Sequence, residues 1–510
     1  MNRADATETH ISTVFFTKDR AYKLLKPVVN GFLDHRSVEA RCAAATREFE
    51  LNRRMCPEVY LGTADVIEKG ELVDRFIVMK RLPASRSVTE LLRLGELQET
   101  HIRDIARSIA RFHAALPPVV LDTDIVEMHR SRWSENVETM TPFIGEVLDA
   151  GDSERIAQLT SSWLESHGEL LHQRVADGLI RDGHGDLLAD DIFCTEDGPQ
   201  ILDCLAFRDD FRLVDVLDDV AFLAMDLHRL AGPDWAQLLL HFYREFSGEN
   251  HPGSLAHYYV AYRAHVRCKI ACLRYGDGQT EAGAVARMYH RLCLDQLERA
   301  RLRMVLVGGG PATGKTTLAQ SLATQLNSVR LSSDEIRKDL AGVSRTTHYV
   351  AEPSEGIYTT EFTERTYDEI MRQADLILRH GDSVVLDASW SRETHRNKAR
   401  TVAAAAGAEL ISLECQLPLS IAKERIVRRF ADPMSVSDAT PEIVDHLDQL
   451  HEAWPEAIVI DTNQPFADVE SIALEAIRCF GLDSQNASPV ARGMTFWGAS
   501  SAHHMPHPLH

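Results

Sequence analysis

The stretch Gly309-Gly310-Pro311-Ala312-Thr313-Gly314-Lys315-Thr316 decides the fold of the second half of this chain. It follows the apolar run Met304 to Val307 and precedes a segment, Lys315 to about Asn327, that favours a helix. In the pattern G-x-x-x-x-G-K-[ST], glycines let backbone N–H groups turn toward phosphate oxygens, the lysine reaches the β- and γ-phosphates, and the hydroxyl holds Mg²⁺. The stretch is therefore interpreted as a phosphate-binding loop, and a glycine-rich turn that binds nothing is the alternative.

A phosphate-binding loop lies between a strand and a helix, because the positive end of the helix dipole then points at the phosphates that the loop binds. Lys315 is expected to neutralise charge on the transferred group, and Thr316 to be a Mg²⁺ ligand. The residues predicted to bind the nucleotide are Gly309, Gly310, Ala312, Thr313, Gly314, Lys315, Thr316 and Thr317.

Length and composition restrict the possible classes of protein. A chain of 510 residues exceeds a single core and suggests about two to four domains. Its formal net charge of −21 argues against a surface for nucleic-acid polymers, because such surfaces depend on Lys and Arg. The chain has no apolar run of about 18 residues, and Met1 to His10 is polar rather than a signal peptide, so we expect a cytoplasmic protein without a membrane partner.

The nine cysteines form no C-x-x-C pair and predict neither a disulfide framework nor a zinc site. Cys268 and Cys272 share a helix face with His265. This pattern favours a core face over metal ligation.

The N-terminal part predicts a small β-rich lobe followed by a larger helical one. A first hairpin carries Lys23, a helix from about Ser37 to Met55 carries Glu48, and a second hairpin follows. The strand-like runs of the two hairpins are His10 to Phe16, Ala21 to Leu25, Leu61 to Ile67 and Leu72 to Met79. Helical spacing of apolar residues then begins near Ala106.

The larger lobe contains two acidic centres on short loops. His184-Gly185-Asp186 stands five residues before Asp191, and Asp203 follows. Phosphoryl transfer to a hydroxyl needs a carboxylate that accepts or orients the hydroxyl proton, and further oxygen ligands that hold Mg²⁺. Asp186 fits the first role, whereas Asp191 and Asp203 fit the second.

On these residues, positions 10 to 295 resemble the aminoglycoside phosphotransferase family, the protein-kinase-like small-molecule kinases that include choline kinases. The resemblance implies a two-lobed protein-kinase-like fold in which Asp186 is the catalytic base. Lys23 would contact the α- and β-phosphates with Glu48 as its helix partner, and Met79 to Leu82 would be the hinge under the adenine. The later acidic segment with Asp215 and Asp218-Asp219 would be structural.

The chain departs from the family pattern at Asp191, where the family has Asn, and it lacks a Gly-rich loop in the first hairpin. An aspartate can ligate Mg²⁺, but it adds negative charge beside a triphosphate. An active kinase, a nucleotide-binding pseudo-kinase and a structural module therefore all remain open for this part.

Beyond the phosphate-binding loop, charged residues follow predicted strands and one predicted helix. Asp334 and Arg337 come after a short strand ending Leu331-Ser332-Ser333 and are expected at the crevice where substrates bind. Asp387 ends a buried strand and is a candidate Mg²⁺ ligand. Four basic residues then share one helix, namely Lys423, Arg425, Arg428 and Arg429.

Positions 302 to 480 resemble the small P-loop kinases related to polynucleotide kinase, gluconate kinase and the zeta toxins. The resemblance implies that Asp334 is a base, that Arg337 binds the acceptor, and that Arg425 and Arg429 belong to a lid over ATP. Residues 301 to 480 contain 19 Lys and Arg against 27 Asp and Glu. A metabolite or nucleotide acceptor is therefore favoured over a polynucleotide.

The sequence thus predicts a multidomain protein with α+β and α/β parts: a two-lobed domain at 1–300, a P-loop domain with a parallel sheet flanked by helices at 301–480, and a disordered tail at 481–510. The favoured function is transfer of the γ-phosphoryl group of Mg-ATP to the hydroxyl of a small molecule. The alternative is a nucleotide-sensing regulatory ATPase with an inactive N-terminal pseudo-kinase domain.

A third possibility is that the first domain inactivates an antibiotic, which would require an acidic acceptor pocket. Asp191, Asp209 and Asp210 are the candidates for such a pocket. The acceptors, the choice between ATP and GTP, and the oligomeric state stay open.

Overall fold

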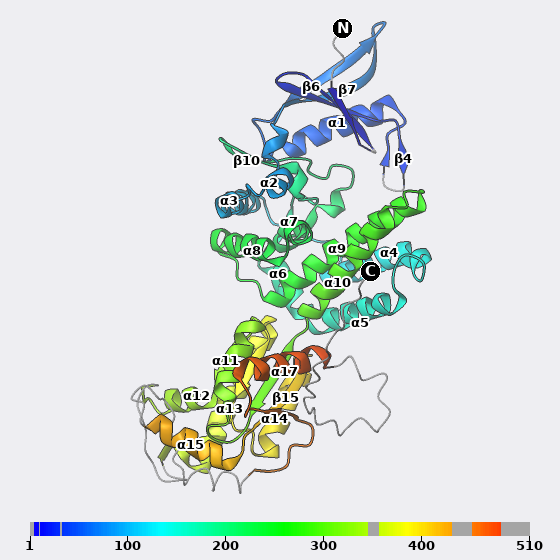
Figure 1. Ribbon diagram of the computed structural model, residues 1–510. Coiled ribbons are helices and arrows are strands. Elements are labelled where there is room, and N and C mark those ends of the chain that lie inside the picture. The colour runs from blue at the N-terminus through cyan, green and yellow to red at the C-terminus, as the bar shows by residue number, and fades with distance from the viewer. Residues whose placement is uncertain (1–4, 10, 31–32, 345–355, 431–450, 481–510) are drawn as a thin grey trace, which may run out of the picture. The chain divides into compact units, whose positions relative to one another are not determined.

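The computed structural model describes residues 5–9, 11–30, 33–344, 356–430 and 451–480 (Figure 1). The chain divides into two compact units. The first unit comprises Met1–Arg303, Gln373–Ser383 and Thr401–Glu409, and the second comprises Met304–Arg372, Val384–Arg400 and Leu410–His510. The predicted tail, 481–510, lies outside the described residues.

The first unit begins with a five-stranded antiparallel sheet in the order β1-β2-β3-β7-β6. Its strands are β1 (Asp5–Glu8), β2 (Ser12–Phe16), β3 (Arg20–Leu25), β6 (Tyr60–Glu68) and β7 (Glu71–Lys80). The two predicted hairpins are present, whereas the edge strand β1 was not predicted. A short pair, β4 (Val29–Asn30) with β5 (Leu33–Asp34), precedes the first helix.

Helix α1 (Val38–Asn52) packs against β6 and β7. It begins at Ser37, whose side chain accepts a hydrogen bond from the N–H of Ala40, a common way to satisfy a free N–H group at a helix start. This packing carries residues of α1 to the sheet that bears Lys23.

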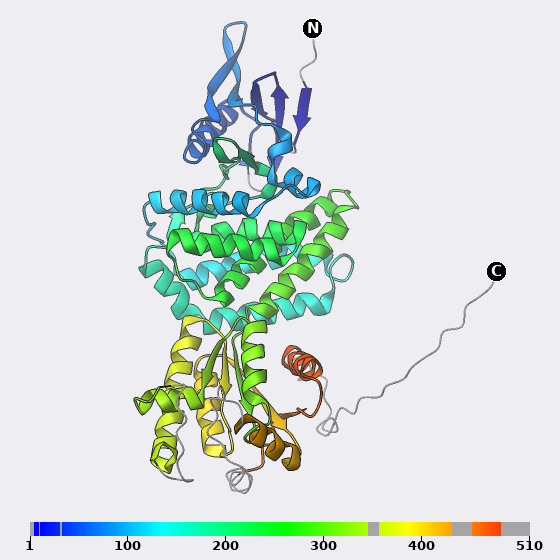
Figure 2. The same cartoon turned by 60° about the vertical axis from the view of Figure 1, so that its left-hand side comes forward.

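Helices form most of the rest of the first unit, and α3 and α8 lie side by side within it (Figure 2). The helices are α2 (Val88–Leu94), α3 (Glu99–Ala115), α4 (Ile125–Met140), α5 (Ala150–Ser166), α6 (Gly168–Ala176), α7 (Val216–Ala231), α8 (Pro233–Ser247), α9 (Gly253–Gly276) and α10 (Ala282–Arg299). Helix α7 is buried over almost its whole length, and α9 packs along both α7 and α10.

Two short antiparallel strand pairs carry the loops between α6 and α7. They are β8 (Ile180–Asp182) with β11 (Leu213–Asp215), and β9 (Ile192–Thr195) with β10 (Gly198–Ile201). The loop with Asp186 connects β8 to β9, and the loop with Asp203 follows β10. The predicted acidic centres therefore lie where short strands end.

The second unit is built on a five-stranded sheet in the order β13-β14-β12-β15-β16, whose described pairings are parallel. The strands are β12 (Arg303–Gly308), β13 (Val329–Ser332), β14 (Val384–Asp387), β15 (Glu409–Gln416) and β16 (Ile458–Asp461). The predicted parallel sheet is confirmed, and the strand before the phosphate-binding loop is its central one.

Helices cover both faces of this sheet because alternate residues of each strand point to opposite sides. They are α11 (Lys315–Gln325), α12 (Ser333–Leu340), α13 (Thr360–His380), α14 (Glu393–Ala405), α15 (Leu419–Phe430) and α17 (Phe466–Cys479). The ends of α13 and α14, from Gln373 and from Thr401, belong to the first unit. Val305 and Val307 share one core with buried residues of α11 and α17. Helices α11 and α17 also contact each other (Figure 1). The loop after β12 consequently lies at the carboxyl edge of the sheet, where ligands bind in such folds.

Candidate functional site

Glycines give the phosphate-binding loop its shape. Gly309 has a φ of 132°, and a Cβ there would come within 2.5 Å of the Cys415 carbonyl oxygen on β15. Gly314, with a φ of 91°, directly precedes α11. Both conformations are unfavourable for residues with a side chain, so the sequence needs glycine at these two positions. Ala312 also has a positive φ, 59°, as the loop turns.

Side chains of the loop fold back onto its own backbone. The Thr313 hydroxyl donates a hydrogen bond of 2.9 Å to the Gly310 carbonyl, and the Lys315 ammonium contacts the same oxygen at 3.4 Å. Thr317 is exposed on the first turn of α11. The N–H groups of that first turn have no partners within the helix. Lys315 and these N–H groups can therefore bind phosphate together.

Thr316 and Asp387 lie next to each other although they are far apart in the sequence. The Thr316 hydroxyl donates to Asp387 Oδ1 at 3.3 Å. Asp387 ends β14 with only 3% of its surface exposed, and its burial raises the pKa of the carboxyl group, with the charge of Lys315 acting in the opposite direction. A hydroxyl beside a carboxylate fits Mg²⁺, which needs only one or two protein ligands when phosphate oxygens supply others.

A further group at this site, Arg330 on β13, was not predicted. Its Nη1 donates to Asp387 Oδ2 at 3.1 Å, and its Nη2 contacts Glu335. Arg330 lies between the apolar residues Val329 and Leu331 of a short strand. A charged residue at that position was the feature of the sequence that could have indicated a functional role for Arg330. Arg330 therefore holds the Asp387 carboxylate from the side opposite Thr316.

The predicted acceptor pair separates in the structure. Asp334 is exposed. It lies close enough to Asp387, beside the phosphate-binding loop, for its negative charge to raise the pKa of the Asp387 carboxyl group. Arg337 is buried instead, and its Nη1 donates to the Ile357 carbonyl at 2.7 Å and to the Thr363 hydroxyl at 3.1 Å. Arg337 thus fixes the segment that leads into α13, a role that the sequence did not indicate.

Of the two predicted lid arginines, Arg425 on α15 reaches the phosphate-binding loop. Its Nη2 donates to the Thr462 carbonyl at 3.1 Å, and its Nη1 lies 3.5 Å from the Ala312 carbonyl. Arg429 belongs to the same helix, but its side chain lies outside the described residues. Arg425 is therefore in place to meet a nucleotide on the loop.

In the first unit, Lys23 lies between two carboxylates. Its Nζ is 2.8 Å from Glu48 on α1 and 2.6 Å from Asp203. Burial lowers the pKa of Lys23, but the charges of Asp203 and Glu48 prevail and raise it well above its usual value. The nearby Lys26 pairs with Glu8 at the sheet edge. The structure thus brings together the three residues that the sequence had assigned to nucleotide and metal binding.

The loop with Asp186 is held by a buried carboxylate of α7. Asp219 accepts hydrogen bonds from the N–H groups of His184 and Gly185, at 2.7 and 2.8 Å. His113 of α3 contacts the same carboxylate at 3.0 Å. Although burial opposes ionisation, these donors lower the pKa of Asp219. The acidic segment that was expected to be structural therefore positions the loop.

The three aspartates of this site repel one another. Burial raises the pKa of Asp186 to about 6. Burial, together with the charges of Asp203 and Asp186, raises the pKa of Asp191 well above its usual value. The N–H of Leu202 donates to the Asp191 carbonyl at 3.0 Å, which joins the two acidic loops. A divalent cation between Asp191 and Asp203 would relieve this repulsion, so the residues fit Mg²⁺.

Within the described residues, no group of three or more His, Cys, Asp or Glu side chains is placed to hold a metal ion without other ligands. Two carboxylates that share a cation with phosphate oxygens are compatible with this finding.

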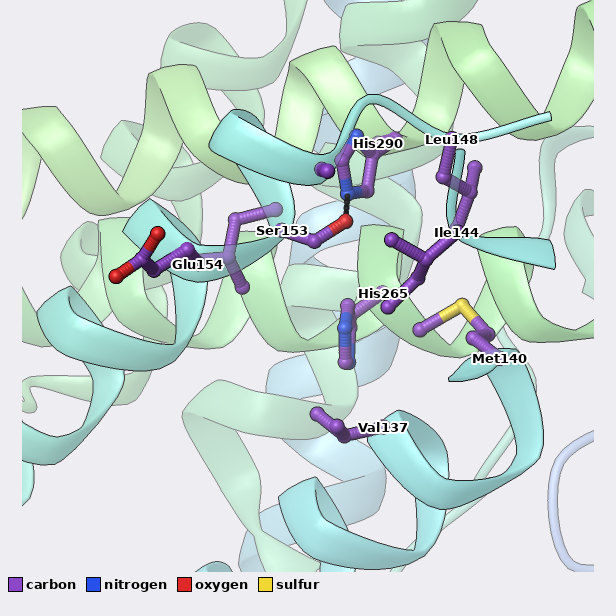
Figure 3. A pocket seen from close by; sticks show the side chains of 10 residues that line it. Val137, Met140, Ile144, Leu148, Ser153, Glu154, His265 and His290 are labelled. Atoms are coloured by element: carbon purple, nitrogen blue, oxygen red, sulfur yellow. Dashed lines mark hydrogen bonds between the residues drawn. The ribbon is translucent and has the colours of Figure 1, made fainter. Parts of the chain in front are cut away.

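A cavity of ≈ 260 Å³ lies elsewhere in the first unit and is lined mainly by apolar side chains (Figure 3). His265 and His290 face it, and His290 Nε2 is 3.1 Å from the Ser153 hydroxyl. Cys268 and Cys272 are wholly buried. The face of α9 with His265 and the two cysteines therefore belongs to a core, as predicted, and no predicted catalytic residue lines the cavity.

Among the described residues, no helix combines the length and the apolar character required to cross a membrane.

Parts of the chain are similar to known proteins. Residues 304–453 match a protein-family model described as AAA domain. The gluconokinase of Sinorhizobium meliloti 1021 is 16% identical, with 36% of this chain and 98% of that chain covered and a TM-score of 0.27. The GDP and kanamycin complex of APH(2")-IIia is 14% identical, with 59% of this chain and 93% of that chain covered and a TM-score of 0.39.

Full-length similarity is found with mycobacterial proteins. "Uncharacterized protein Rv2004c" of Mycobacterium tuberculosis is 36% identical over 464 residues, which cover 90% of this chain and 93% of that protein. "Uncharacterized protein Mb2027c" of Mycobacterium bovis matches to the same extent. Such identity over both units of the fold shows common ancestry for the whole two-unit arrangement, and the chain belongs to the family of these mycobacterial proteins.

Proposed function

We propose that the second unit is an ATP-dependent phosphotransferase that transfers the γ-phosphoryl group of Mg-ATP to the hydroxyl of a small molecule. One observation carries this proposal: the Thr316 hydroxyl and the buried Asp387 carboxylate meet beside the glycine loop and Lys315. Phosphoryl transfer depends mainly on positioning and on neutralising charge, and these residues supply both. Mg²⁺, bound at Thr316 and Asp387, would neutralise the phosphates.

The side chains around the loop then divide the work of the reaction. Lys315 and the first turn of α11 bind the phosphates, and Arg425 adds positive charge from α15. Asp334 is exposed at the same edge of the sheet and orients the acceptor hydroxyl. The acceptor oxygen bonds to the γ-phosphorus, the bond to the β-phosphate oxygen breaks, and the hydroxyl proton passes to Asp334.

We further propose that the first unit is a second, protein-kinase-like phosphotransferase. The contacts of Lys23 with Glu48 and Asp203 support a nucleotide site there. Asp186, with its pKa raised by burial to about 6, suits a general base near neutral pH, because such a group is ionised and still accepts a proton. Asp191 and Asp203 would hold Mg²⁺.

A nucleotide-sensing regulatory ATPase is the alternative, and one observation favours it. Arg337 is engaged by Ile357 and Thr363, so Asp334 lacks the arginine with which it was expected to bind an acceptor. A regulator needs no acceptor pair. Nucleotide hydrolysis in the second unit would then change the conformation of the segment leading into α13.

Transfer of label from γ-labelled ATP into a fractionated metabolite extract distinguishes the two functions. The full-length protein is compared with Thr316→Ala, Lys315→Ala and Asp186→Asn. Thr324→Ala is the matched control for Thr316→Ala, because Thr324 is exposed on the same helix and its hydroxyl donates to the Gln320 carbonyl.

Two kinases predict separate labelled products, one lost in Lys315→Ala and the other in Asp186→Asn. A single product lost only in Lys315→Ala would restrict catalysis to the second unit. Free phosphate without any labelled acceptor would contradict the phosphotransferase proposal and support the regulatory ATPase.

A further inference from the structure

Helix α9 carries two arginines, Arg263 and Arg267, and the first of them contacts the loop that carries Asp186. Arg263 Nη1 is 3.4 Å from the Gly185 carbonyl. Arg263 also forms two hydrogen bonds with Asp218, at 2.7 and 2.9 Å, so its charge is neutralised inside the protein. Arg267 stands four residues further along, and residues at this spacing share one face of a helix.

Arg267 differs from Arg263 in its partners. Arg267 hydrogen-bonds the side chain of Tyr289, and its Nε is buried without a hydrogen-bond partner. In the part of the chain that the structure describes, no carboxylate forms an ion pair with Arg267. Burial lowers the pKa of Arg267, but the negative charge of Asp186 raises it above the usual value. Arg267 therefore lies near the proposed base with one part of its guanidinium bound to Tyr289, and its unpartnered Nε can donate to a ligand.

The acids that would suit a cationic acceptor are already paired with arginines. Asp209 contacts Arg212 at 2.8 Å and Arg47 at 3.3 Å. Asp210 is bound by Arg208 at 2.7 Å. These pairs neutralise two of the three aspartates that an acidic, aminoglycoside-binding pocket would require.

We propose that the acceptor of the first unit is an anionic alcohol, a compound with a hydroxyl and a carboxylate or phosphate group, and that Arg267 binds its anionic group. This inference rests on the proposed kinase function of the first unit. The acceptor hydroxyl must lie within hydrogen-bond reach of Asp186, so groups close to Asp186 flank the acceptor. A guanidinium binds carboxylate and phosphate through paired N–H donors, which makes Arg267 a specificity-determining residue.

The reaction at this site balances as a simple group transfer. The acceptor oxygen forms a bond to the γ-phosphorus, while the bond between that phosphorus and the β-phosphate oxygen breaks. ADP leaves with the electron pair, and the hydroxyl proton passes to Asp186. Arg267 binds the anionic group and neither gives nor receives the transferred proton.

The test uses the full-length protein with Lys315→Ala, which silences the second unit. Metabolite extract is separated by charge into anionic, neutral and cationic pools, and each pool is incubated with γ-labelled ATP. We expect label in the anionic pool, and Asp186→Asn should abolish it. Arg267→Gln should raise the half-saturating concentration of the active anionic fraction about ten- to a hundredfold and leave that of ATP unchanged.

Arg274→Gln is the matched control. It removes the same charge from the same helix at a position where the guanidinium is exposed and bonds to Gln279. This control should leave both half-saturating concentrations unchanged. If Arg267→Gln raises the half-saturating concentration of ATP as much as that of the acceptor, Arg267 supports the fold and the inference is wrong.

The failures of the two proposals look different. Label in the neutral or cationic pool that disappears in Asp186→Asn would overturn the anionic acceptor and retain the kinase. Absence of any label sensitive to Asp186→Asn in all three pools would overturn the kinase function of the first unit, and the inference with it.

Discussion

Gly309 shows how a single residue fixes the geometry of the phosphate-binding loop. Gly309 has a φ of 132°, and a Cβ at this position would lie 2.5 Å from the Cys415 carbonyl oxygen. There is therefore no room for a side chain. Gly309→Ala should destabilise the second unit by about 1–3 kcal/mol, the usual cost of a strained backbone conformation. Thermal unfolding of the full-length protein measures this loss.

Gly310→Ala is the comparison within the same loop. A Cβ at Gly310 would have its nearest neighbour, Thr313 Cγ2, at 3.8 Å. Its thermal stability should stay close to that of the native protein. Equal losses in the two variants would show that the contact with Cys415 does not restrict Gly309.

Asp186 predicts the pH dependence of transfer by the first unit. A base acts only when ionised, and burial raises the pKa of this carboxyl group to about 6. With Lys315→Ala present, transfer should be constant above this pH and fall about tenfold per pH unit below it. Asp186→Asn should lower the rate about 10²–10⁴-fold.

The variant Arg267→Gln tests the same pH dependence in a second way. The positive charge of Arg267 lowers the pKa of Asp186, against the larger effect of burial. Arg267→Gln should therefore move the acidic limb of the profile to higher pH. An unchanged limb would mean that Arg267 and Asp186 do not interact.

Three buried histidines of the first unit stay neutral: His129 on α4, His167 at the end of α5 and His265 on α9. Burial lowers the pKa of His129 and of His265 to about 3, and that of His167 to about 4. Each ring packs on aromatic side chains, as His167 does on Trp163 and His265 on Trp133. The unfolded chain binds a proton at each of them near pH 6.5.

The sign of the effect on stability follows from these values. Between pH 6.5 and about 4, the unfolded state binds more protons than the folded state, so the stability of the first unit falls as the pH falls through this window. Each histidine should contribute at most about 1.4 kcal/mol per pH unit. Denaturant unfolding at a series of pH values measures the slope.

His265→Phe should reduce this slope, because the cavity beside His265 has space for the larger ring. His241→Phe is the control, since His241 is exposed on α8. A slope that is equal in both variants would show that His265 does not contribute to the acid sensitivity.

Features encoded within one stretch of chain could be predicted, and features that depend on contacts between distant segments could not. The glycine loop and the alternation around Lys23 predicted their local structures because spacing alone determines them. The pairing of Arg330 with Asp387 depends on the register of β13 beside β14. The support of the Asp186 loop by Asp219 likewise joins a strand end to a distant helix.

A contact between distant segments also explains why the predicted acceptor pair of the second unit, Asp334 and Arg337, is not together in the structure. Asp334 and Arg337 are one helical turn apart, a spacing that predicts a shared face. The structure turns Arg337 toward the Ile357 carbonyl, which belongs to a segment that follows residues outside the described part. Local spacing gave no information on that contact.

At the scale of the whole molecule, each of the two compact units has its own proposed nucleotide site. Lys315 belongs to one site, and Lys23, bound to Glu48 and Asp203, belongs to the other. A ligand that binds only the folded state stabilises it by about 2.7 kcal/mol at a hundredfold excess over its dissociation constant. Mg-ADP should therefore raise the unfolding temperature of both units.

Single variants separate the two contributions in the full-length protein. Lys315→Ala should remove the Mg-ADP-dependent shift of one calorimetric transition, and Lys23→Ala that of the other. Arg291→Ala, which removes an exposed positive charge of α10, should change neither shift. If Lys315→Ala instead removed both shifts, nucleotide would bind to one site alone and stabilise both units through it, which would favour the regulatory alternative. Two shifts that disappear independently mean two separate nucleotide sites, which a protein with two phosphotransferase activities must have.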